Sequence, residues 1–450
     1  MSNAQRPRVV VIGGGPAGAA AAGSLAQAGA EVVVFERDTF PRHHVGESLQ
    51  PATFTLLDEH LGLGERFAAA GFAYKFGAVY VWGESREPWR VLFDPRLEQD
   101  LDGLDEAALL SGGYEHAWQV ERSRFDHILL SRAAELGADV RFGSTVLAPL
   151  GDASRVRGVR VRHASGAEED VLADMVLDGS GQRCLLGRAL KLQQPITDMR
   201  STATYAYYQG AGGVPGVLGR HVQLVVTVPE GWVWFIPTGP DRTSVGVVHR
   251  GRERISLARF EAALASAGLP MGSAVRLDGP RPDQPLHFAR DWSFSHRQFA
   301  GPGWALLGDA ACFVDPILSG GVDAAVRSGF GASLAVLRAF GEPGADPAAL
   351  FAAYDQEVRG DFRAYLRLAR YWYGNNRSVE GLFWEAHREI PVDSVSTPMR
   401  AFVYLTSGQY AADRHLRVFD TWQEKNIFRS LGVDRRALRR ARRKVTDRRS

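Results

Sequence analysis

A glycine-rich loop near the start of the chain has the spacing of a dinucleotide-binding turn. Gly13, Gly15 and Gly18 follow a β-branched run and precede an alanine-rich segment. The first glycine permits a tight turn, the second lets a pyrophosphate approach the backbone, and the third lets helix and strand pack closely. Glu36 ends the next β-branched run, where a carboxylate can bind a ribose hydroxyl. The motif predicts a bound dinucleotide, but it does not separate FAD from NAD.

Two further stretches carry residues suited to reactive chemistry. Lys75 lies among aromatic residues in 72–78. A lysine there commonly extends to solvent, but a desolvated lysine has a lowered pKa and exposes a nucleophilic amine. Ser319 precedes Gly320 and Gly321. Successive glycines can present backbone N–H groups to a small anion, although a loop that only contacts a cofactor would have the same composition.

A pair of tryptophans is spaced to line one side of a strand. Trp232 and Trp234 lie in the run GWVWFIP, 231–237. Alternate residues of a strand share a face, so both indoles point the same way. They form either an ordinary core or a bulky wall beside a reactive site.

Several of these stretches resemble motifs of one enzyme family. The run LLGDAA at 306–311 is similar to the second flavin motif of the aromatic-hydroxylase superfamily. The run GWVWFIP resembles the WxWxIP signature of flavin-dependent halogenases, and FVDPILSGG at 313–321 resembles their FxxPxxSxG motif. The KxGA context of Lys75 matches as well. Over nearly its whole length, the chain resembles the flavin-dependent halogenases, in the phenol and pyrrole branch that serves natural-product assembly lines.

The resemblance implies FAD as the cofactor. Asp309 corresponds to the aspartate that contacts the ribityl chain, and Arg122 to an arginine that faces the pyrophosphate. Alternatives are a helix cap for Asp309 and a surface position for Arg122. The expected FAD-binding residues are Gly13, Gly15, Ala17, Gly18, Glu36, Arg42, Ser48, Arg122, Asp309, Pro316 and Gly321.

The family's chemistry implies roles for the remaining motifs. Reduced FAD and O2 form a hydroperoxide, and chloride or bromide held at Gly320 and Gly321 attacks it to give hypohalous acid. Lys75 then receives the halogen through a tunnel, either by hydrogen bonding or as a haloamine, and delivers it to an activated ring carbon. Ser319 is the second expected catalytic residue. The expected wall between flavin and substrate consists of Trp232, Trp234, Phe235 and Pro237.

One departure from the family narrows the substrate. Tryptophan halogenases carry a glutamate directly before the serine of this loop, and Leu318 stands there instead. This favours an electron-rich phenol or pyrrole over free tryptophan. The rival activities on the same fold are a flavin-dependent aromatic hydroxylase and a prenyl-chain reductase, which do not need Lys75 or the tryptophan pair.

Charge and composition bear on the partners. The net charge of +2 gives no reason to expect nucleic acid or membrane as a partner. No second GxGxxG is present, which favours a separate flavin reductase. Residues 434–450 hold nine basic residues and two aspartates. They form either a solvated terminal helix or a docking site for an acidic acyl or peptidyl carrier protein that bears the substrate. Two cysteines without metal or disulfide spacing predict no metal site and a cytoplasmic location.

The elements that position these residues predict an α/β fold. A Rossmann-type FAD-binding domain is expected from residues 1–195 and 295–345, with a substrate-side β-sheet inserted at 196–294. A helical C-terminal region with a basic tail is expected at 346–450. Strands are expected at 8–12, 31–36, 76–82, 202–208, 222–228, 233–237 and 244–249, and helices at 52–70, at 122–136 and from about 322.

Overall fold

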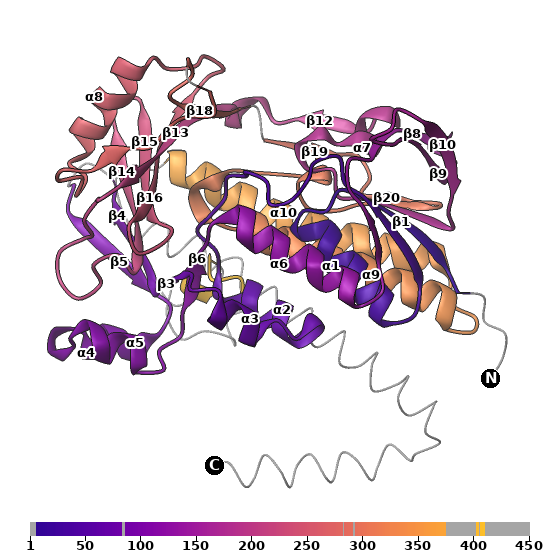
Figure 1. Ribbon diagram of the computed structural model, residues 1–450, viewed down its shortest axis with the longest axis horizontal. Coiled ribbons are helices and arrows are strands. Elements are labelled where there is room, and N and C mark those ends of the chain that lie inside the picture. Colours follow the sequence, from indigo (N-terminus) through magenta and orange to yellow (C-terminus); the bar gives the residue numbers. More distant parts are fainter. Residues whose placement is uncertain are drawn as a thin grey trace, which may run out of the picture.

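The polypeptide builds two large β-sheets joined by helices (Figure 1). The structure is a computed structural model that describes residues 6–82, 86–281, 283–290, 293–374, 402–404 and 406–409. The predicted α/β fold with a Rossmann-type unit and a second sheet is confirmed.

The first sheet has six strands, and the glycine-rich loop follows its central strand. Its strands are parallel except at one edge, where β20 runs against β21. In spatial order they are β20 (Ala300–Gly301), β21 (Trp304–Leu306), β11 (Met175–Asp178), β1 (Arg8–Ile12), β2 (Glu31–Phe35) and β7 (Asp139–Arg141). After its first residue β1 is fully buried, as expected for a strand covered on both faces.

Helices cover one face of this sheet and a small antiparallel sheet covers the other. Figure 1 shows α1 (Pro16–Gln27), α6 (Arg122–Glu135) and α9 (Gly321–Gly341) side by side. On the opposite face, valines of β1 and β2 share a core with the meander of β8 (Thr145–Asp152), β9 (Arg155–Arg162) and β10 (Glu168–Leu172). The helices expected at 122–136 and from about 322 are confirmed. The segment 52–70 forms two helices, α2 (Pro51–Leu61) and α3 (Gly64–Ala69), because Gly62 ends the first in a left-handed conformation.

The second sheet has eight strands and stands beside the first. In spatial order they are β17 (Val275–Arg276), β13 (Ser201–Gln209), β16 (Arg242–Arg250), β15 (Gly231–Pro237), β14 (Val222–Val228), β4 (Gly77–Val81) and β5 (Pro88–Leu92), with β18 (His287–Arg290) also paired to β13. The four strands expected within 196–294 are present as β13, β14, β15 and β16. The expected boundaries of 196–294 were too narrow, because β4 and β5 come from the first segment. Their membership depends on a parallel pairing of β4 with β14, which local sequence patterns do not reveal.

Short elements complete the described chain. Two-stranded pairs join β3 (Ala73–Lys75) to β6 (Ala117–Gln119) and β12 (Gln193–Pro195) to β19 (Phe294–His296). The small helices are α4 (Pro95–Asp100), α5 (Glu106–Ser111), α7 (Leu185–Ala189) and α8 (Leu257–Ala267). Single 3₁₀ turns lie at Leu101–Gly103, Gly181–Arg183, Thr197–Met199, Gly308–Ala310 and Pro316–Leu318.

The expected helical C-terminal region begins with α10 (Pro347–Gly374), which packs against the cavity-facing side of the second sheet. Most of the remaining region, including the basic tail at 434–450, lies outside the described residues. Among the helices that the structure does describe, none combines the length and the apolar character needed to cross a membrane.

Candidate active site

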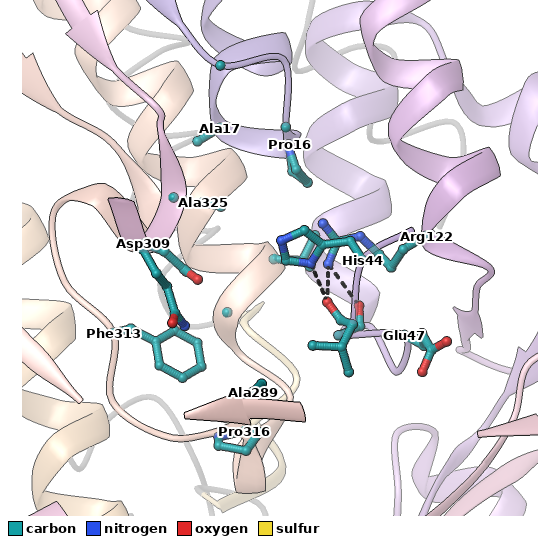
Figure 2. Close-up of a pocket in the computed structure, with 18 of the residues that line it drawn as sticks. Pro16, Ala17, His44, Glu47, Arg122, Ala289, Asp309, Phe313, Pro316 and Ala325 are labelled. Carbon is teal, nitrogen blue, oxygen red and sulfur yellow. Dashed lines mark hydrogen bonds between the residues drawn. The ribbon is translucent and has the colours of Figure 1, made fainter. Parts of the chain in front are cut away.

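A cavity of about 590 Å³ opens where the two sheets meet. Its walls are the turns after β1, β2 and β21, the segment 42–48, and the inner face of the second sheet. Figure 2 shows side chains from these elements around one space. The predicted residues that line it are Gly13, Gly15, Ala17, Glu36, Arg42, Ser48, Arg122, Trp232, Trp234, Asp309, Pro316, Ser319 and Gly321.

The glycine loop has the geometry that a phosphate cradle requires. Gly13 adopts a φ of +89°, which strongly favours glycine. A Cβ on Gly18 would overlap the carbonyl oxygen of Gly13, so the third glycine is needed for close packing. A Cβ on Gly15 would meet only Arg42, at 3.3 Å, and would enter the cavity. Helix α1 begins at Pro16, directly beside this space. Its free N–H groups can therefore face an anion there.

The Glu36 carboxylate is held in place at the end of β2. It is buried, and its two oxygens accept hydrogen bonds from the backbone N–H of Gly14 at 2.7 Å and of Asp38 at 2.8 Å. Since a carboxylate oxygen can accept more than one hydrogen bond, the group retains capacity for a ligand hydroxyl.

The Arg122 guanidinium holds the cavity wall as well as facing the cavity. It donates to both carboxylate oxygens of Asp126, at 2.7 and 3.1 Å. It also donates to the carbonyl oxygens of Val45 and Gly46, at 2.8 and 3.2 Å (Figure 2). Arg42 also pairs with Asp126, at 3.5 Å. Sequence reasoning missed Asp126, although its i,i+4 spacing from Arg122 on one helix was a usable signal.

Asp309 lies across the cavity from Arg122 (Figure 2). It follows β21 in a 3₁₀ turn. Burial raises the pKa of its carboxyl to about 6, and the nearby charge of Arg122 works in the opposite direction. The group is therefore mostly ionised at neutral pH and can accept hydrogen bonds from a polyol chain.

Ser319 and Gly321 of the serine–glycine turn line the large cavity. Ser319 adopts a φ of +55°, and its hydroxyl donates to the side chain of Gln223 at 3.1 Å. Gly321 lines the large cavity, but Gly320 does not. Gly320 lines a second cavity of about 70 Å³ instead, where a Cβ would stand 2.7 Å from the ring of Tyr365. Gly321 lines this second cavity as well, so the turn lies between the two cavities.

The strand expected to form the wall is confirmed, with two corrections. Trp232 and Trp234 share the cavity face of β15, and the indole N–H of Trp234 donates to the Ser244 hydroxyl at 3.1 Å. Phe235 packs with Val233 in the core beneath the opposite face. Neither Phe235 nor Pro237 lines the cavity, because alternate residues of a strand point to opposite sides.

Lys75 is buried next to the cavity but does not line it. Its ammonium donates to the carbonyl oxygen of Leu49 at 2.8 Å and lies 5.3 Å from the centre of the Phe93 ring. Burial lowers its pKa to about 7. The residue before Leu49 is Ser48, which does line the cavity. Lys75 therefore lies behind the Ser48–Leu49 backbone.

The same segment reaches the serine–glycine turn. The buried side-chain amide of Gln50 donates to the carbonyl oxygen of Leu318 at 3.0 Å. Lys75 and the turn at Ser319 are thus attached to neighbouring residues of one short segment. Sequence reasoning did not single out Gln50, because its contact spans 268 positions.

Other cavity residues were also missed. Glu47 is buried, and its desolvation raises the pKa of the carboxyl to about 7. His43 accepts or donates a hydrogen bond at 3.2 Å with the Tyr205 hydroxyl and lies 4.6 Å from the His287 ring. Burial lowers the pKa of both imidazoles, which favours their uncharged forms. A loop and two distant strands supply this cluster, which no local pattern indicated.

Comparison with known proteins agrees with this geometry. An FAD-binding domain family matches residues 6–360. A tryptophan 2-halogenase of Chondromyces crocatus is 31% identical over 89% of this chain and 74% of its own length. A 1H-pyrrole-2-carbonyl-[peptidyl-carrier protein] chlorinase of Pseudomonas fluorescens is 31% identical over 71% of this chain and 73% of its own.

The chain belongs to the flavin-dependent halogenases. The solved structure of the myxobacterial chondrochloren halogenase CndH, an FAD-dependent halogenase, has a TM-score of 0.73 with 29% identity, and the match covers 89% of this chain and 90% of that one. None of these three relatives is named as a hydroxylase or a reductase.

The cofactor of this halogenase is FAD, and the cavity suits it. The Gly15 cradle and the start of α1 fit the pyrophosphate, Glu36 fits the ribose, and Asp309 fits the ribityl chain. The segment 45–48 and the turn 316–321 line the remaining space, where a planar ring can lie.

Two glycine substitutions separate folding from cofactor binding. We expect Gly18→Ala to destabilise the protein by about 1–3 kcal/mol or more, because its Cβ overlaps the Gly13 backbone. We expect Gly15→Ala to fold normally but to bind FAD at least about tenfold more weakly, a loss of about 1.4 kcal/mol, because its Cβ occupies the phosphate space. Thermal unfolding without FAD and a fluorescence titration with FAD measure the two effects. Unchanged FAD affinity in Gly15→Ala would contradict the placement of the pyrophosphate.

Proposed function

We propose that this halogenase chlorinates or brominates an electron-rich aromatic ring, a phenol or a pyrrole, and that Lys75 relays the halogen. Reduced FAD, supplied by a separate reductase, would give two electrons to O2 and the halide would give two more, so that one oxygen atom leaves as water and the other becomes part of hypohalous acid. The observation that carries the proposal is the position of Lys75, buried behind the cavity wall with a pKa of about 7.

The surroundings of Lys75 suit a relay. The carbonyl oxygen of Leu49 fixes the amine, and the Phe93 ring keeps it in a dry environment. With a pKa near 7, the charged and uncharged forms are both populated at neutral pH. The ammonium can donate a hydrogen bond to hypohalous acid, and the free amine can take the halogen as a haloamine. Ser319, whose hydroxyl is held by Gln223, is the second proposed catalytic residue.

The proposed ring class rests on Leu318. Its side chain is buried beside the serine–glycine turn, where a carboxylate would otherwise stand. Without that carboxylate, less assistance is available to an unactivated ring, so phenols and pyrroles are the better acceptors. One relative is named for a pyrrole carried on a peptidyl carrier protein and another for tryptophan.

The carrier protein and the halide site complete the proposal. We place the halide at the Ser319–Gly321 turn, on the cavity side where Gly321 lies. We propose that the net charge of +7 at residues 434–450 attracts an acidic carrier protein that presents the ring.

If Lys75 relays the halogen, replacing it should abolish halogen transfer to the ring but leave FAD binding intact. We expect Lys75→Met to lower halogenated product at least about 100-fold, the scale of a lost catalytic group, with FAD affinity unchanged, because Lys75 does not line the FAD cavity. Lys191→Met, at an exposed turn, is the matched control. Product is measured by mass and FAD binding by fluorescence. A Lys75→Met enzyme that halogenates at the full rate would remove the relay.

The pH profile of turnover separates the two forms of Lys75. Because its pKa is lowered to about 7, the uncharged amine predominates above that pH. We expect turnover to rise as pH increases through about 7, and Lys75→Arg, which keeps the charge but cannot lose it, to be nearly inactive. A profile that falls over this range would instead assign the transfer to the ammonium form.

The substrate proposal is tested with free and carrier-bound rings. Phenols and pyrrole-2-carboxylate, free and attached to an acidic carrier protein, are incubated with the enzyme, a flavin reductase and halide, and products are read by mass. We expect a chain ending at Asp434 to lose at least about tenfold in kcat/KM for the bound ring only, and to lose the salt dependence of that reaction. Equal loss with free rings would indicate damage to the enzyme rather than docking.

A further inference from the structure

A chain of hydrogen bonds, buried at both ends, connects the wall of the cavity with the serine–glycine turn through the half-buried Tyr373 of α10. The indole N–H of Trp232 donates to the Tyr373 hydroxyl at 2.7 Å. Tyr373 lies at 3.0 Å from both carboxylate oxygens of Asp315. Asp315 in turn accepts the backbone N–H of Ile317 at 2.9 Å, which caps the turn before Ser319.

The chemistry of the three groups sets the direction of this chain. An indole N–H only donates, so the Tyr373 oxygen must accept from Trp232, and its own proton goes to Asp315. Trp232 and Asp315 are both buried, with 2% and 7% of their surface exposed. A buried N–H that loses its partner is left unsatisfied in the protein interior, so the hydrogen bond to Tyr373 favours this one position of the Trp232 indole.

The two ends of the chain belong to the same cavity. Trp232 lines it from the second sheet, and Pro316, Ser319 and Gly321 line it from the turn. Their separation therefore sets the width of the cavity beside the turn where we place the halide. Tyr373 of α10 forms hydrogen bonds to both sides.

We propose that Tyr373 is a positioning residue of the halogenation reaction. It holds the Trp232 indole against the serine–glycine turn, so that hypohalous acid formed in the cavity passes to the substrate side instead of escaping. The inference rests on the halogenase activity of the family and is independent of the Lys75 relay.

Tyr373→Phe tests the position of Trp232 directly, without FAD or turnover. The full-length protein is labelled with 5-fluorotryptophan, and the Trp232 resonance is assigned by its loss in Trp232→Phe. We expect Tyr373→Phe to shift or broaden that resonance, since the Phe ring keeps the packing but frees the indole. Tyr114→Phe is the matched control, because it removes an exposed tyrosine–aspartate hydrogen bond of 2.9 Å, to Asp100 at the end of α4, and neither residue lines the cavity. An unchanged Trp232 resonance in Tyr373→Phe overturns the proposal.

The second measurement compares how much halogen reaches the acceptor ring with how much escapes into solution. The FAD-loaded enzyme, a reductase and halide are supplied with a phenol or pyrrole acceptor and with monochlorodimedone, which traps free hypohalous acid. We expect Tyr373→Phe to raise the ratio of halogenated trap to halogenated acceptor at least about fivefold, with the sum of the two nearly unchanged. An equal fall in both products, with the ratio constant, contradicts a positioning role.

A double substitution decides whether Tyr373 acts through Trp232. In a Trp232→Phe background, we expect Tyr373→Phe to have no further effect on that ratio, because the two changes remove one interaction. Additive effects overturn the proposal.

If Tyr373→Phe fails to fold, Asp315→Asn weakens the same chain from its other end and is read by the same fluorine spectrum. If no ring accepts halogen, the ring-class proposal fails, and the fluorine spectrum still decides this one.

Discussion

The buried guanidinium of Arg122 holds the segment from Val45 to Gln50, and both halves of the active site depend on that segment. Asp126 neutralises the guanidinium, and the carbonyl oxygens of Val45 and Gly46 accept hydrogen bonds from another of its nitrogen atoms. The residues that follow line the FAD cavity, accept the Lys75 ammonium and bind the Leu318 carbonyl. Removing one partner of a buried ion pair costs about 3–5 kcal/mol, so this anchor resists displacement.

Burial is the dominant influence on the titratable groups around the cavity. It raises the pKa of Glu47 to about 7 and that of Asp309 to about 6, and it lowers the pKa of Lys75 to about 7. Two carboxyl groups and an amine, whose ordinary pKa values lie far apart, therefore have pKa values close to neutral pH. Such convergence is a common property of sites that move protons or nucleophiles. It arises because two sheets and several helices exclude water from one region.

Residues that act within one short stretch were the easiest to predict. The strand–loop–helix around Gly13 and Gly18, the acid at Glu36 and the shared face of Trp232 and Trp234 follow from local spacing, and the structure has all of them. Phe235 was misplaced through neglect of the same strand alternation that placed the tryptophans.

The sequence by itself determined that this protein is an FAD-dependent halogenase with a Rossmann-type sheet, because the cofactor loop and the family motifs are local and their chemistry depends on residue type and spacing. Only the tertiary structure decided that β4 and β5 join the second sheet, that Lys75 lies behind Leu49, and that Tyr373 joins Trp232 to Asp315. These features depend on contacts between segments far apart in the chain. Such contacts form when many buried surfaces pack at once, so they cannot be predicted from the residue pattern of any one segment.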